Sequence, residues 1–378
     1  MPVCRSASFA GLFYLMFVLL ILQGCGGGGG GGGGGGSSAA PAPPGTNPGP
    51  ELPPEQGTGT LDLVGMNVAG AEFTPGVLPG IHGTHYFFPP PGYFQQWRDR
   101  GIRSVRFPIR WERLQPVLGD DFDPTYAGLI DNMLSQAANA QIDVILDIHD
   151  YGRYRGNLIG SPEVPYEDYQ NLLERVALRW RDRTALYGYD IMNEPAGIQT
   201  WPTAAQAAIN GIRRYDMLRP IFIESAGSSS ATNWPTYGND LLDLEDPADY
   251  LIFSAHLYLD EGSRGTYPNP PGDAFDPMTG VRRASAFVEW LRKNYRRGHI
   301  GEFGVPGDDP RWLEGMDNLL AYLQEQCIPM AYWAAGHQWR DDYPLLVEPG
   351  PDGEGQPQWE VLSDYVGEGD CSVYGPPP

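Results

Sequence analysis

The sequence contains few cysteines, and their positions limit how disulfides can support the fold. Of the four cysteines in 378 residues, Cys4 and Cys25 lie in or at the end of an apolar N-terminal segment. Only Cys327 and Cys371 remain, so the rest of the chain can close one disulfide at most. A bond between them would pin the C-terminal tail and would suit an exported protein. Two unrelated buried thiols are the alternative, and the sequence leaves both open.

Positive charge is also scarce. The chain has 25 Lys and Arg against 47 Asp and Glu, a formal net charge of −22, and the acidic residues are spread along its length. A field of this sign repels phosphate backbones. The composition argues against a nucleic-acid partner, and an uncharged ligand fits better.

One long hydrophobic run stands near the N-terminus. "GLFYLMFVLLILQGC", residues 11–25, follows Arg5 and is typical of an export signal, which we place at residues 1–25. A transmembrane helix is the alternative, but the run is near the lower length limit and no polar stop-transfer boundary follows it. The ending "LQGC" resembles a bacterial lipobox, which implies lipidation of Cys25. We therefore expect an exported protein that is lipid-anchored to a membrane or cell surface, or secreted.

The next segment has little that could form a core. Residues 26–36 are all glycine, and residues 37–60 are rich in Pro, Ala, Ser and Gly. Such a composition cannot bury enough apolar surface to order itself, so residues 26–59 are predicted to be a flexible linker. Residues 60–378 have enough apolar and aromatic residues for one large catalytic domain with a C-terminal tail. We expect this protein to be a monomer.

Apolar runs alternate with amphipathic segments eight times. The predicted strands are "LDLVGMNV", "IRSVRFPI", "IDVILDIH", "LYGYDIMN", "RPIFIES", "YLIFSAHLY", "HIGEFGV" and "IPMAYWAA". Residues 166–180 and 311–326 are two of the predicted helices, the latter with Leu313, Met316 and Leu320 on its apolar face. Strand followed by helix, eight times over, predicts an α/β fold of the (β/α)8 barrel type.

Polar or aromatic side chains stand at the end of almost every predicted strand. They are Asn67, Arg106, His149, Asn193, Glu194, Glu224, His256, Tyr258, Glu302 and Trp333. Because the C-terminal ends of barrel strands open onto the face where active sites form, these residues predict a site there.

Two of these residues, Glu194 and Glu302, are expected to face each other across the barrel mouth. Paired carboxylates of this kind carry out glycoside hydrolysis, one as a protonated acid and the other ionised. Taken singly, either glutamate could equally be a structural partner of a nearby arginine.

The strings "VRFPIRW", "DIHDYGRY", "MNEP", "AHLY", "GEFG" and "AYWAAG" resemble the signature strands of glycoside hydrolase family 5, the cellulase family of clan A retaining glycosidases. The resemblance extends from Asn67 to Trp333. It implies a hydrolase that needs no cofactor and binds a neutral polysaccharide or oligosaccharide. The strings "VRFPIRWERLQP" and "YWAAG" look most like the endo-β-1,4-glucanases of the family. Mannan, xyloglucan and β-1,3-glucan remain alternative substrates.

The resemblance also implies roles for individual residues. Glu194 matches the general acid/base and Glu302 the nucleophile. Arg106 matches the residue that keeps the nucleophile ionised, and Asn193 the donor to the sugar 2-hydroxyl. The remaining matches surround the cleaved sugar: His149, His256 and Tyr258 as polar neighbours, with Tyr258 near the nucleophile, and Trp333 as the aromatic platform.

Further aromatic residues follow predicted strands, where loops build the walls of a cleft. They are Tyr154, Trp201, Trp234, His337 and Trp339. Some of these should simply cover the barrel, so only Trp339 is retained as a substrate-binding residue. Residues 260–280 are too rich in Gly and Pro for a helix and predict a long rim loop after the sixth strand.

Two other classes of protein compete with this interpretation. A metal-dependent barrel hydrolase would use His82, His85, Asp147, His149 and His256 as ligands. Its weakness is spacing, because His82 and His85 lie three apart in a loop and not as a His-x-His pair on the first strand. A non-catalytic sugar-binding lipoprotein would need an aromatic cleft but not both Glu194 and Glu302. We therefore predict no metal site.

Overall fold

The computed structural model describes residues 61–378 except 198, 351, 368, 369 and 378. The predicted export signal, the lipobox-like cysteine and the linker, residues 1–59, lie outside the described residues.

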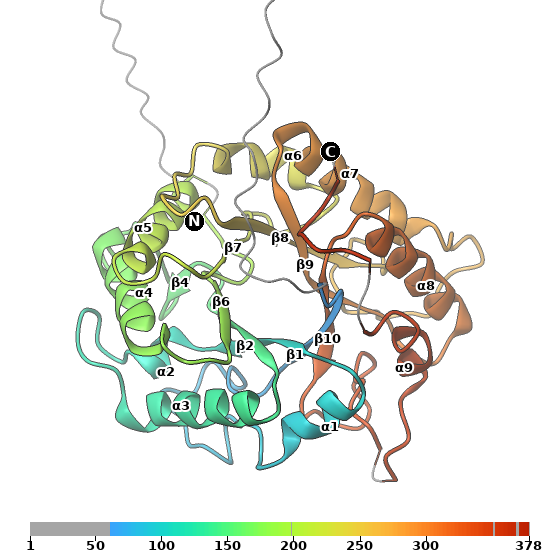
Figure 1. The fold of residues 1–378 in the computed structure, drawn as a ribbon, viewed down its shortest axis with the longest axis horizontal. Helices are drawn as coiled ribbons and strands as arrows, with labels where there is room; N and C mark the ends of the chain where they lie inside the picture. Colours follow the sequence, from blue (N-terminus) through green and yellow to red (C-terminus); the bar gives the residue numbers. More distant parts are fainter. Residues whose placement is uncertain (1–60, 198, 351, 368–369, 378) are drawn as a thin grey trace, which may run out of the picture. The chain divides into compact units, whose positions relative to one another are not determined.

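Eight parallel strands close into a barrel in the order β1-β10-β9-β8-β7-β6-β3-β2 (Figure 1). The barrel strands are β1 (Val64–Val68), β2 (Ser104–Ile109), β3 (Asp143–Ile148), β6 (Leu186–Asp190), β7 (Ile221–Ile223), β8 (Leu251–Tyr258), β9 (Arg297–Gly304) and β10 (Met330–Ala335). Each overlaps one of the eight predicted runs, so the predicted (β/α)8 barrel is confirmed.

The strands are apolar almost throughout because helices cover the outer face of the barrel and side chains fill the inside. Every residue of β1 and β9 is buried, and β8 is buried except at Leu251. The polar exceptions in β8 and β9 include His256 and Glu302 near the strand ends, and Ser254, Arg297 and His299 in the first half of the strands. Polar side chains therefore lie both at the open end of the barrel and deeper in it.

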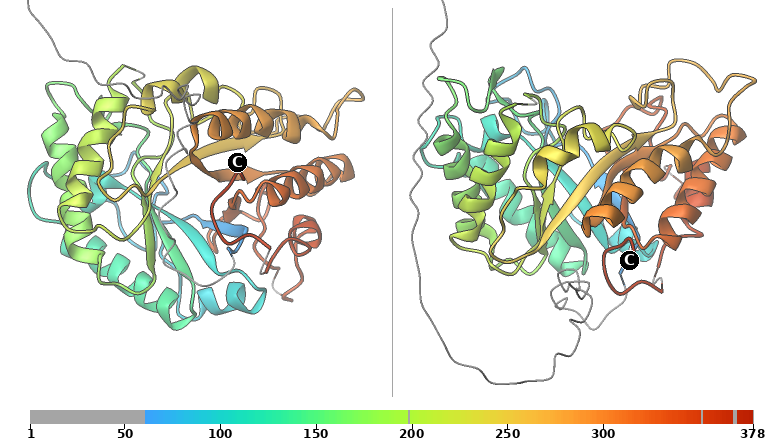
Figure 2. Two further views of the ribbon diagram at one scale, coloured as in Figure 1. Left: turned by 45° about the horizontal axis from the view of Figure 1, so that its top comes forward. Right: turned by 90° about the horizontal axis from the view of Figure 1, so that it is seen from above.

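Helices surround the ring of strands (Figures 1 and 2). They are α1 (Tyr93–Asp99), α2 (Trp111–Leu114), α3 (Pro124–Asn139), α4 (Tyr166–Trp180), α5 (Trp201–Arg213), α6 (Trp234–Tyr237), the 3₁₀ helix η1 (Gly238–Leu241), α7 (Thr279–Asn294), α8 (Pro310–Glu325) and α9 (Pro357–Leu362). The aspartates before α3 and α8, Asp123 and Asp309, cap the helices by accepting from backbone amides.

The two predicted helices form within one residue of their expected bounds, as α4 and α8. In α8, however, Leu313 is only partly buried and Trp312 is buried in its place. The apolar face of α8 is therefore turned slightly from the face expected from the leucine spacing.

A short hairpin after β3 was not predicted. Strands β4 (Arg153–Tyr154) and β5 (Asn157–Leu158) pair antiparallel across the two-residue loop Arg155–Gly156. Both loop residues have positive φ, 49° and 84°, which is the backbone of a type I′ turn.

The predicted rim loop is confirmed, since the chain between β8 and α7 has neither helix nor strand.

The C-terminal tail closes the face of the barrel at which the strands begin. A disulfide joins Cys327 and Cys371. Beyond it, Gly375 accepts from the amide of Gly298 near the start of β9 and donates to the carbonyl of Cys327. Tyr374 packs with Phe222, Ile145 and Ile252 in a small buried cluster.

Within the described residues, no helix combines the length and the apolar character needed to cross a membrane.

Candidate active site

Arg106 on β2 is the centre of a buried polar network at the C-terminal end of the barrel. Its side chain is fully buried. Its three nitrogens contact six side chains: Asn67 at 3.0 Å, Asp147 at 3.1 Å, Asp190 at 2.8 Å, Asn193 at 2.8 Å, Glu224 at 2.9 Å and Glu302 at 2.9 Å. These partners come from β1, β3, β6, β7 and β9 or directly follow them, so one guanidinium ties together strands from around the barrel.

The network holds more acids than Arg106 can neutralise. Burial alone would lower the pKa of Arg106, but Asp147 and the other carboxylates raise it well above its usual value. Burial raises the pKa of Asp147 to about 8 and that of Asp190 to about 6, although Arg106 opposes both shifts. Arg106 therefore stays charged, while its most enclosed acidic neighbours take up protons more readily than free aspartate.

Glu302 on β9 is held by two donors. Its Oε1 accepts from Arg106 at 2.9 Å, and its Oε2 accepts from the hydroxyl of Tyr258 at 2.7 Å. The side chain is only 7% exposed. Asn67 donates to the carbonyl of Gly301, the preceding residue, at 2.9 Å. The position and orientation of this carboxylate are therefore fixed before any ligand binds.

Glu194 lies just after β6 and is more open. Its side chain is 23% exposed, and its φ of +40° is unusual for a residue with a side chain. The backbone amide of Glu194 donates to Oε2 of Glu224 at 2.7 Å. This contact anchors the backbone at Glu194, whose carboxylate reaches into the mouth of the barrel.

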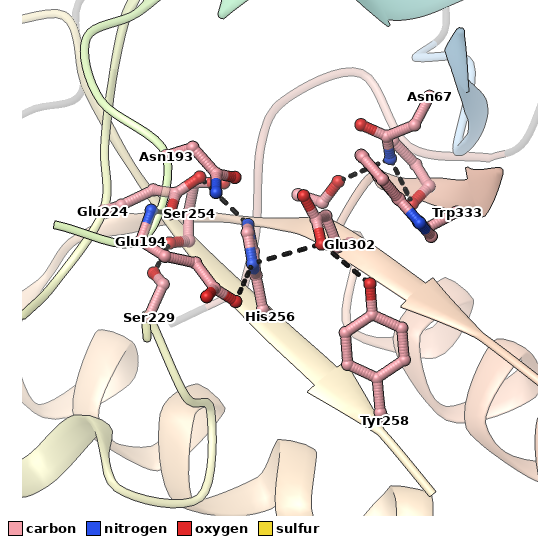
Figure 3. A network of polar contacts seen from close by, with 12 residues as sticks. Asn67, Asn193, Glu194, Glu224, Ser229, Ser254, His256, Tyr258, Glu302 and Trp333 are labelled. Carbon is pink, nitrogen blue, oxygen red and sulfur yellow. Dashed lines mark hydrogen bonds and ion pairs between the residues drawn. The ribbon is translucent and has the colours of Figure 1, made fainter. Parts of the chain in front are cut away.

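His256 on β8 lies between the two glutamates (Figure 3). Its Nδ1 is 3.0 Å from Glu194 Oε1 and 3.5 Å from Glu302 Oε2, and its Nε2 is 2.9 Å from Glu224 Oε1. Burial alone would lower the pKa of His256, but the carboxylates of Glu224 and Glu302 raise it well above its usual value. His256 is therefore an imidazolium that donates from both nitrogens.

The two candidate catalytic carboxylates are close together. One oxygen of Glu194, one oxygen of Glu302 and a ring nitrogen of His256 all lie within 4.8 Å of one another. They differ in surroundings, because Glu302 is enclosed by Arg106 and Tyr258 whereas Glu194 faces more solvent. Two carboxylates of different environment at this separation can divide the roles of acid and nucleophile.

An aromatic wall lies beside the carboxylates. Trp333 on β10 stacks on His149 with ring centroids 5.6 Å apart, and its indole nitrogen donates to the hydroxyl of Tyr343 at 3.0 Å. Burial lowers the pKa of His149 to about 3, so this ring is neutral. Tyr343 in turn stacks on Trp339 with centroids 4.1 Å apart.

The structure brings together eight of the predicted site residues in one mouth: Arg106, His149, Asn193, Glu194, His256, Tyr258, Glu302 and Trp333. Trp339 lies at the edge of this group. It meets Trp333 edge-on at 6.3 Å, and the ring of Tyr343 covers one of its faces.

Three aromatic residues considered for the cleft wall are packed into the fold. Trp201 and Trp234 are 2% and 0% exposed, and Tyr154 is 5% exposed. Trp201 donates to the carbonyl of Glu224, and Tyr154 to the carbonyls of Gln115 and Pro116. These three residues cover the barrel, as was expected for some members of this aromatic set. His337 is partly buried beside Phe87 and Tyr93.

Sequence analysis included Glu224, which directly follows β7, among the residues that predict a site, but missed its individual role. Its carboxylate is fully buried and contacts Arg106, His256 and the amide of Glu194. Tyr343 was also missed, since it lies in a loop eight residues after β10 and nothing in its neighbourhood in the sequence marks it.

The ligand set of the metal-hydrolase alternative does not come together. His85 accepts from the amide of Ile81, and His82 packs against Tyr86 and Phe88. In the described part of the chain, the one cluster of acids and histidines with metal-binding spacing is Glu194, His256 and Glu302. The residues that could hold an ion are thus the paired carboxylates themselves.

A closed (β/α)8 barrel with paired carboxylates around a buried arginine defines the class of a barrel glycosidase. Residues 66–338 match the family model of cellulase, glycosyl hydrolase family 5. This chain belongs to that family, as its signature strings implied, and is a glycoside hydrolase.

Relatives and solved structures agree with this assignment. The endoglucanase Cel5A of Pseudomonas stutzeri, solved in complex with cellobiose, is 45% identical, with a TM-score of 0.81 over 85% of this chain and 96% of that one. XacCel5A in complex with cellopentaose is 34% identical, with a TM-score of 0.76 over 81% of this chain and 99% of that one. The endo-beta-1,4-glucanase B of Emericella nidulans is 31% identical over 75% of this chain and 85% of that protein.

Proposed function

We propose that this protein is a retaining endo-β-1,4-glucanase that cleaves its substrate by double displacement. The observation that carries the proposal is the closeness of Glu194 and Glu302. One carboxylate oxygen of Glu194 lies within 4.8 Å of one carboxylate oxygen of Glu302, and a ring nitrogen of His256 lies within the same distance of both. Retaining enzymes hold their carboxyl groups about 5 to 5.5 Å apart, and inverting enzymes about 6.5 to 9.5 Å apart. The short separation leaves no room for a water molecule between Glu302 and a bound sugar.

Glu302 is the nucleophile in this mechanism. Its hydrogen bonds from Arg106 and Tyr258 aim the carboxylate at one position. One oxygen forms a bond to the anomeric carbon, and the glycosidic oxygen leaves with the bonding electron pair. Glu194 gives its proton to that oxygen, so that a neutral alcohol departs.

The second step reverses these movements. Glu194, now ionised, takes a proton from water, and the water oxygen attacks the anomeric carbon while Glu302 is released. His256 donates to Glu194 throughout, and its charge is balanced by Glu224. This link lets Glu194 change its protonation state without moving.

Asn193 and Trp333 position the sugar. The Oδ1 of Asn193 accepts from Arg106 at 2.8 Å, which leaves its amide NH₂ to donate to the sugar 2-hydroxyl. That contact strengthens in an oxocarbenium-like transition state. Trp333 is partly exposed and offers a flat apolar surface to the C–H face of a pyranose.

The proposed substrate is a neutral β-1,4-glucan. Relatives named endoglucanase, and neighbours solved with cellobiose and cellopentaose, support this choice. A panel of carboxymethylcellulose, barley β-glucan, mannan, xyloglucan and laminarin tests it, with hydrolysis expected on the first two. Faster release of reducing ends from mannan or laminarin would overturn the substrate assignment.

The roles of the two glutamates are tested by removing each. Glu302→Ala loses the nucleophile and should be inactive on polysaccharide and on dinitrophenyl cellobioside alike. Glu194→Ala should lose about 10² to 10⁴-fold on polysaccharide, because a poor leaving group needs its proton. It should still react with the dinitrophenyl substrate, accumulate the covalent intermediate, and turn over to the β-glycosyl azide when azide is added. Azide rescue of Glu302→Ala with the β-azide as product would reverse the two roles, because a retained product requires that the other glutamate forms the covalent intermediate.

The export signal and the lipid anchor at Cys25 are part of the proposal. The lipobox-like "LQGC" and the Gly-rich linker, 26–59, suit a monomeric hydrolase held near a surface. The native protein should then fractionate with membranes, and Cys25→Ser should be soluble. Native protein found wholly in the culture fluid with its N-terminus elsewhere would contradict the anchor.

A further inference from the structure

The first part of the rim loop wraps around Tyr258, the residue that donates to Glu302. We name residues Asp260–Tyr267 the clamp loop. Tyr258 ends β8 and its hydroxyl lies 2.7 Å from Glu302 Oε2 (Figure 3). Contacts within this loop fix its path, and others connect it to Tyr258 and to the neighbouring end of β9.

A buried carboxylate organises the clamp loop. Asp260 is 2% exposed. Its Oδ1 accepts from the amides of Arg264 and Gly265, each at 2.9 Å, and its Oδ2 accepts from the amide of Thr266 at 3.2 Å. Three successive amides therefore converge on one side chain and fix the path of the backbone through Gly265.

The backbone of Tyr258 is held from two sides. The hydroxyl of Ser263 accepts from the amide of Tyr258 at 3.1 Å and donates to its carbonyl at 3.0 Å. Arg283 on α7 donates to the same carbonyl and to the carbonyl of Asp260.

Tyr267 closes the loop onto the strand that carries the nucleophile. It is 8% exposed, and its hydroxyl accepts from the amide of Leu259 at 2.8 Å and donates to the carbonyl of Gly304 at 2.5 Å. Leu259 follows Tyr258 and Gly304 lies two residues after Glu302. The hydroxyl of Tyr267 thus fixes the spacing between the end of β8, which carries Tyr258, and the end of β9, which carries Glu302.

Gly265 is the point at which the clamp loop meets the ring of Tyr258. Its φ is +69°, and a Cβ placed there would lie 2.8 Å from Cε1 and 2.9 Å from Cδ1 of that ring. Real Cβ atoms do not approach so closely. Glycine therefore lets the backbone of residue 265 lie directly against the ring of Tyr258.

We propose that Gly265 is a positioning residue, which the Asp260 carboxylate holds against Tyr258 so that the tyrosine hydroxyl stays on the nucleophile. The proposal rests on the proposed function in that Glu302 is taken as the nucleophile. It assigns to the rim loop a part in the first chemical step, separate from any contact with polysaccharide.

The same loop offers a matched control. Gly262 also has positive φ, +85°, but a Cβ there would meet only the side chain of Arg264, at 3.5 Å. Alanine at either position suffers similar backbone strain, since both glycines are left-handed. Only Gly265→Ala places a methyl group against Tyr258.

The experiment measures how fast each variant forms the covalent intermediate. Dinitrophenyl 2-deoxy-2-fluoro-β-cellobioside labels the nucleophile because fluorine slows both steps, whereas the good leaving group speeds only the first, so the covalent intermediate accumulates. We expect Gly265→Ala to be labelled about tenfold or more slowly than the wild type, the loss that follows when a hydrogen bond to a charged group is spoiled. Gly262→Ala should be labelled at nearly the wild-type rate, with a similar fall in melting temperature.

A second pair of variants isolates the hydroxyl. Tyr258→Phe has no hydrogen bond to lose, so adding Gly265→Ala to it should slow labelling little further. If Gly265→Ala does not fold, Asp260→Asn replaces it, because an amide cannot accept from three amides as the carboxylate does. Its control is Glu261→Gln, an exposed neighbour that loses the same charge.

The outcomes separate the two proposals. If mass spectrometry finds no label on Glu302 of the wild type, the proposed function fails. If Glu302 is labelled but Gly265→Ala reacts as fast as Gly262→Ala, or slows Tyr258→Phe by a further tenfold, the positioning role of Gly265 is overturned.

Discussion

Nδ1 of His256 lies 3.0 Å from Oε1 of Glu194, and this contact joins a buried positive charge to the more exposed of the two active-site carboxylates. The charge persists because the acids around His256 raise its pKa well above 6.5, although burial opposes them. The site thus contains two cations, His256 and Arg106, among its carboxylates.

The first prediction concerns pH. The pKa of His256 is higher in the folded than in the unfolded protein, so its contribution to stability is complete below about pH 6.5 and is lost as the pH rises through the folded value. The difference in melting temperature between the wild type and His256→Gln should therefore shrink as the pH rises from 6. A difference in melting temperature that grows with rising pH would show that the imidazole of His256 is neutral.

His149 provides an internal contrast. Its folded pKa is about 3, below the unfolded value, so its contribution is complete above about pH 6.5 and is lost as the pH falls towards 3. The difference in melting temperature between wild type and His149→Gln should therefore shrink on the acid side, opposite to His256. Equal behaviour of the two variants would contradict the assignment of one charged and one neutral ring.

The second prediction concerns Glu224. Glu224→Gln keeps the shape of the side chain but removes the charge that faces Arg106 and His256 at 2.9 Å. We expect kcat to fall roughly tenfold, since hydrogen bonds between charged groups are the strong ones, with little change in KM. The pKa of His256 should also fall, because the carboxylate of Glu224 raises it in the wild type. Glu261→Gln, on the surface, should change neither.

The third prediction concerns the aromatic wall. Tyr343→Phe keeps the ring on Trp339 but removes the hydroxyl that accepts from the indole nitrogen of Trp333. Freeing that indole should raise KM for cello-oligosaccharides by roughly 2- to 10-fold, with kcat little changed. Tyr295→Phe is the control, because Tyr295 is 61% exposed. A fall in kcat alone would show that Tyr343 acts on the carboxylates instead.

The fourth prediction concerns the disulfide. Cys327 and Cys371 are 44 residues apart, and the chain-entropy model gives roughly 4 kcal/mol for closing a loop of this length. The double variant Cys327→Ser with Cys371→Ser should melt at a clearly lower temperature. It should keep its kcat at 25 °C, because the bond lies at the opposite end of the barrel from Glu302. If the double variant melted at the wild-type temperature but lost activity, the disulfide would act on the active site and not on stability.

The barrel and most of the candidate site could be predicted because both follow from local signals. Eight apolar runs define the strands, and a charged residue at the end of such a run, such as Arg106 or Glu302, marks the open face. Trp201 and Trp234 are buried in the fold for a reason visible in the sequence. Each is followed by proline, which is common in the first turn of a helix, and each begins a helix that packs against the barrel.

Other features depend on contacts between distant residues. Nothing around Glu224 in the sequence indicates that Arg106, 118 positions earlier, and His256, 32 positions later, converge on it. The stacking of Tyr343 on Trp339 likewise depends on the path of a loop that has neither helix nor strand. Such contacts are set by the closure of the barrel, which no single segment encodes.

The described chain enters the barrel at Leu61, whose amide donates to the carbonyl of Cys371 at 2.6 Å, beside the disulfide. Entry and exit of the polypeptide therefore share the face where the strands begin, and the mouth with Glu194 and Glu302 opens at the other end. Both ends of the described domain therefore lie away from that mouth. Domains fused at residue 61 or after residue 377 would attach at the face opposite Glu194 and Glu302.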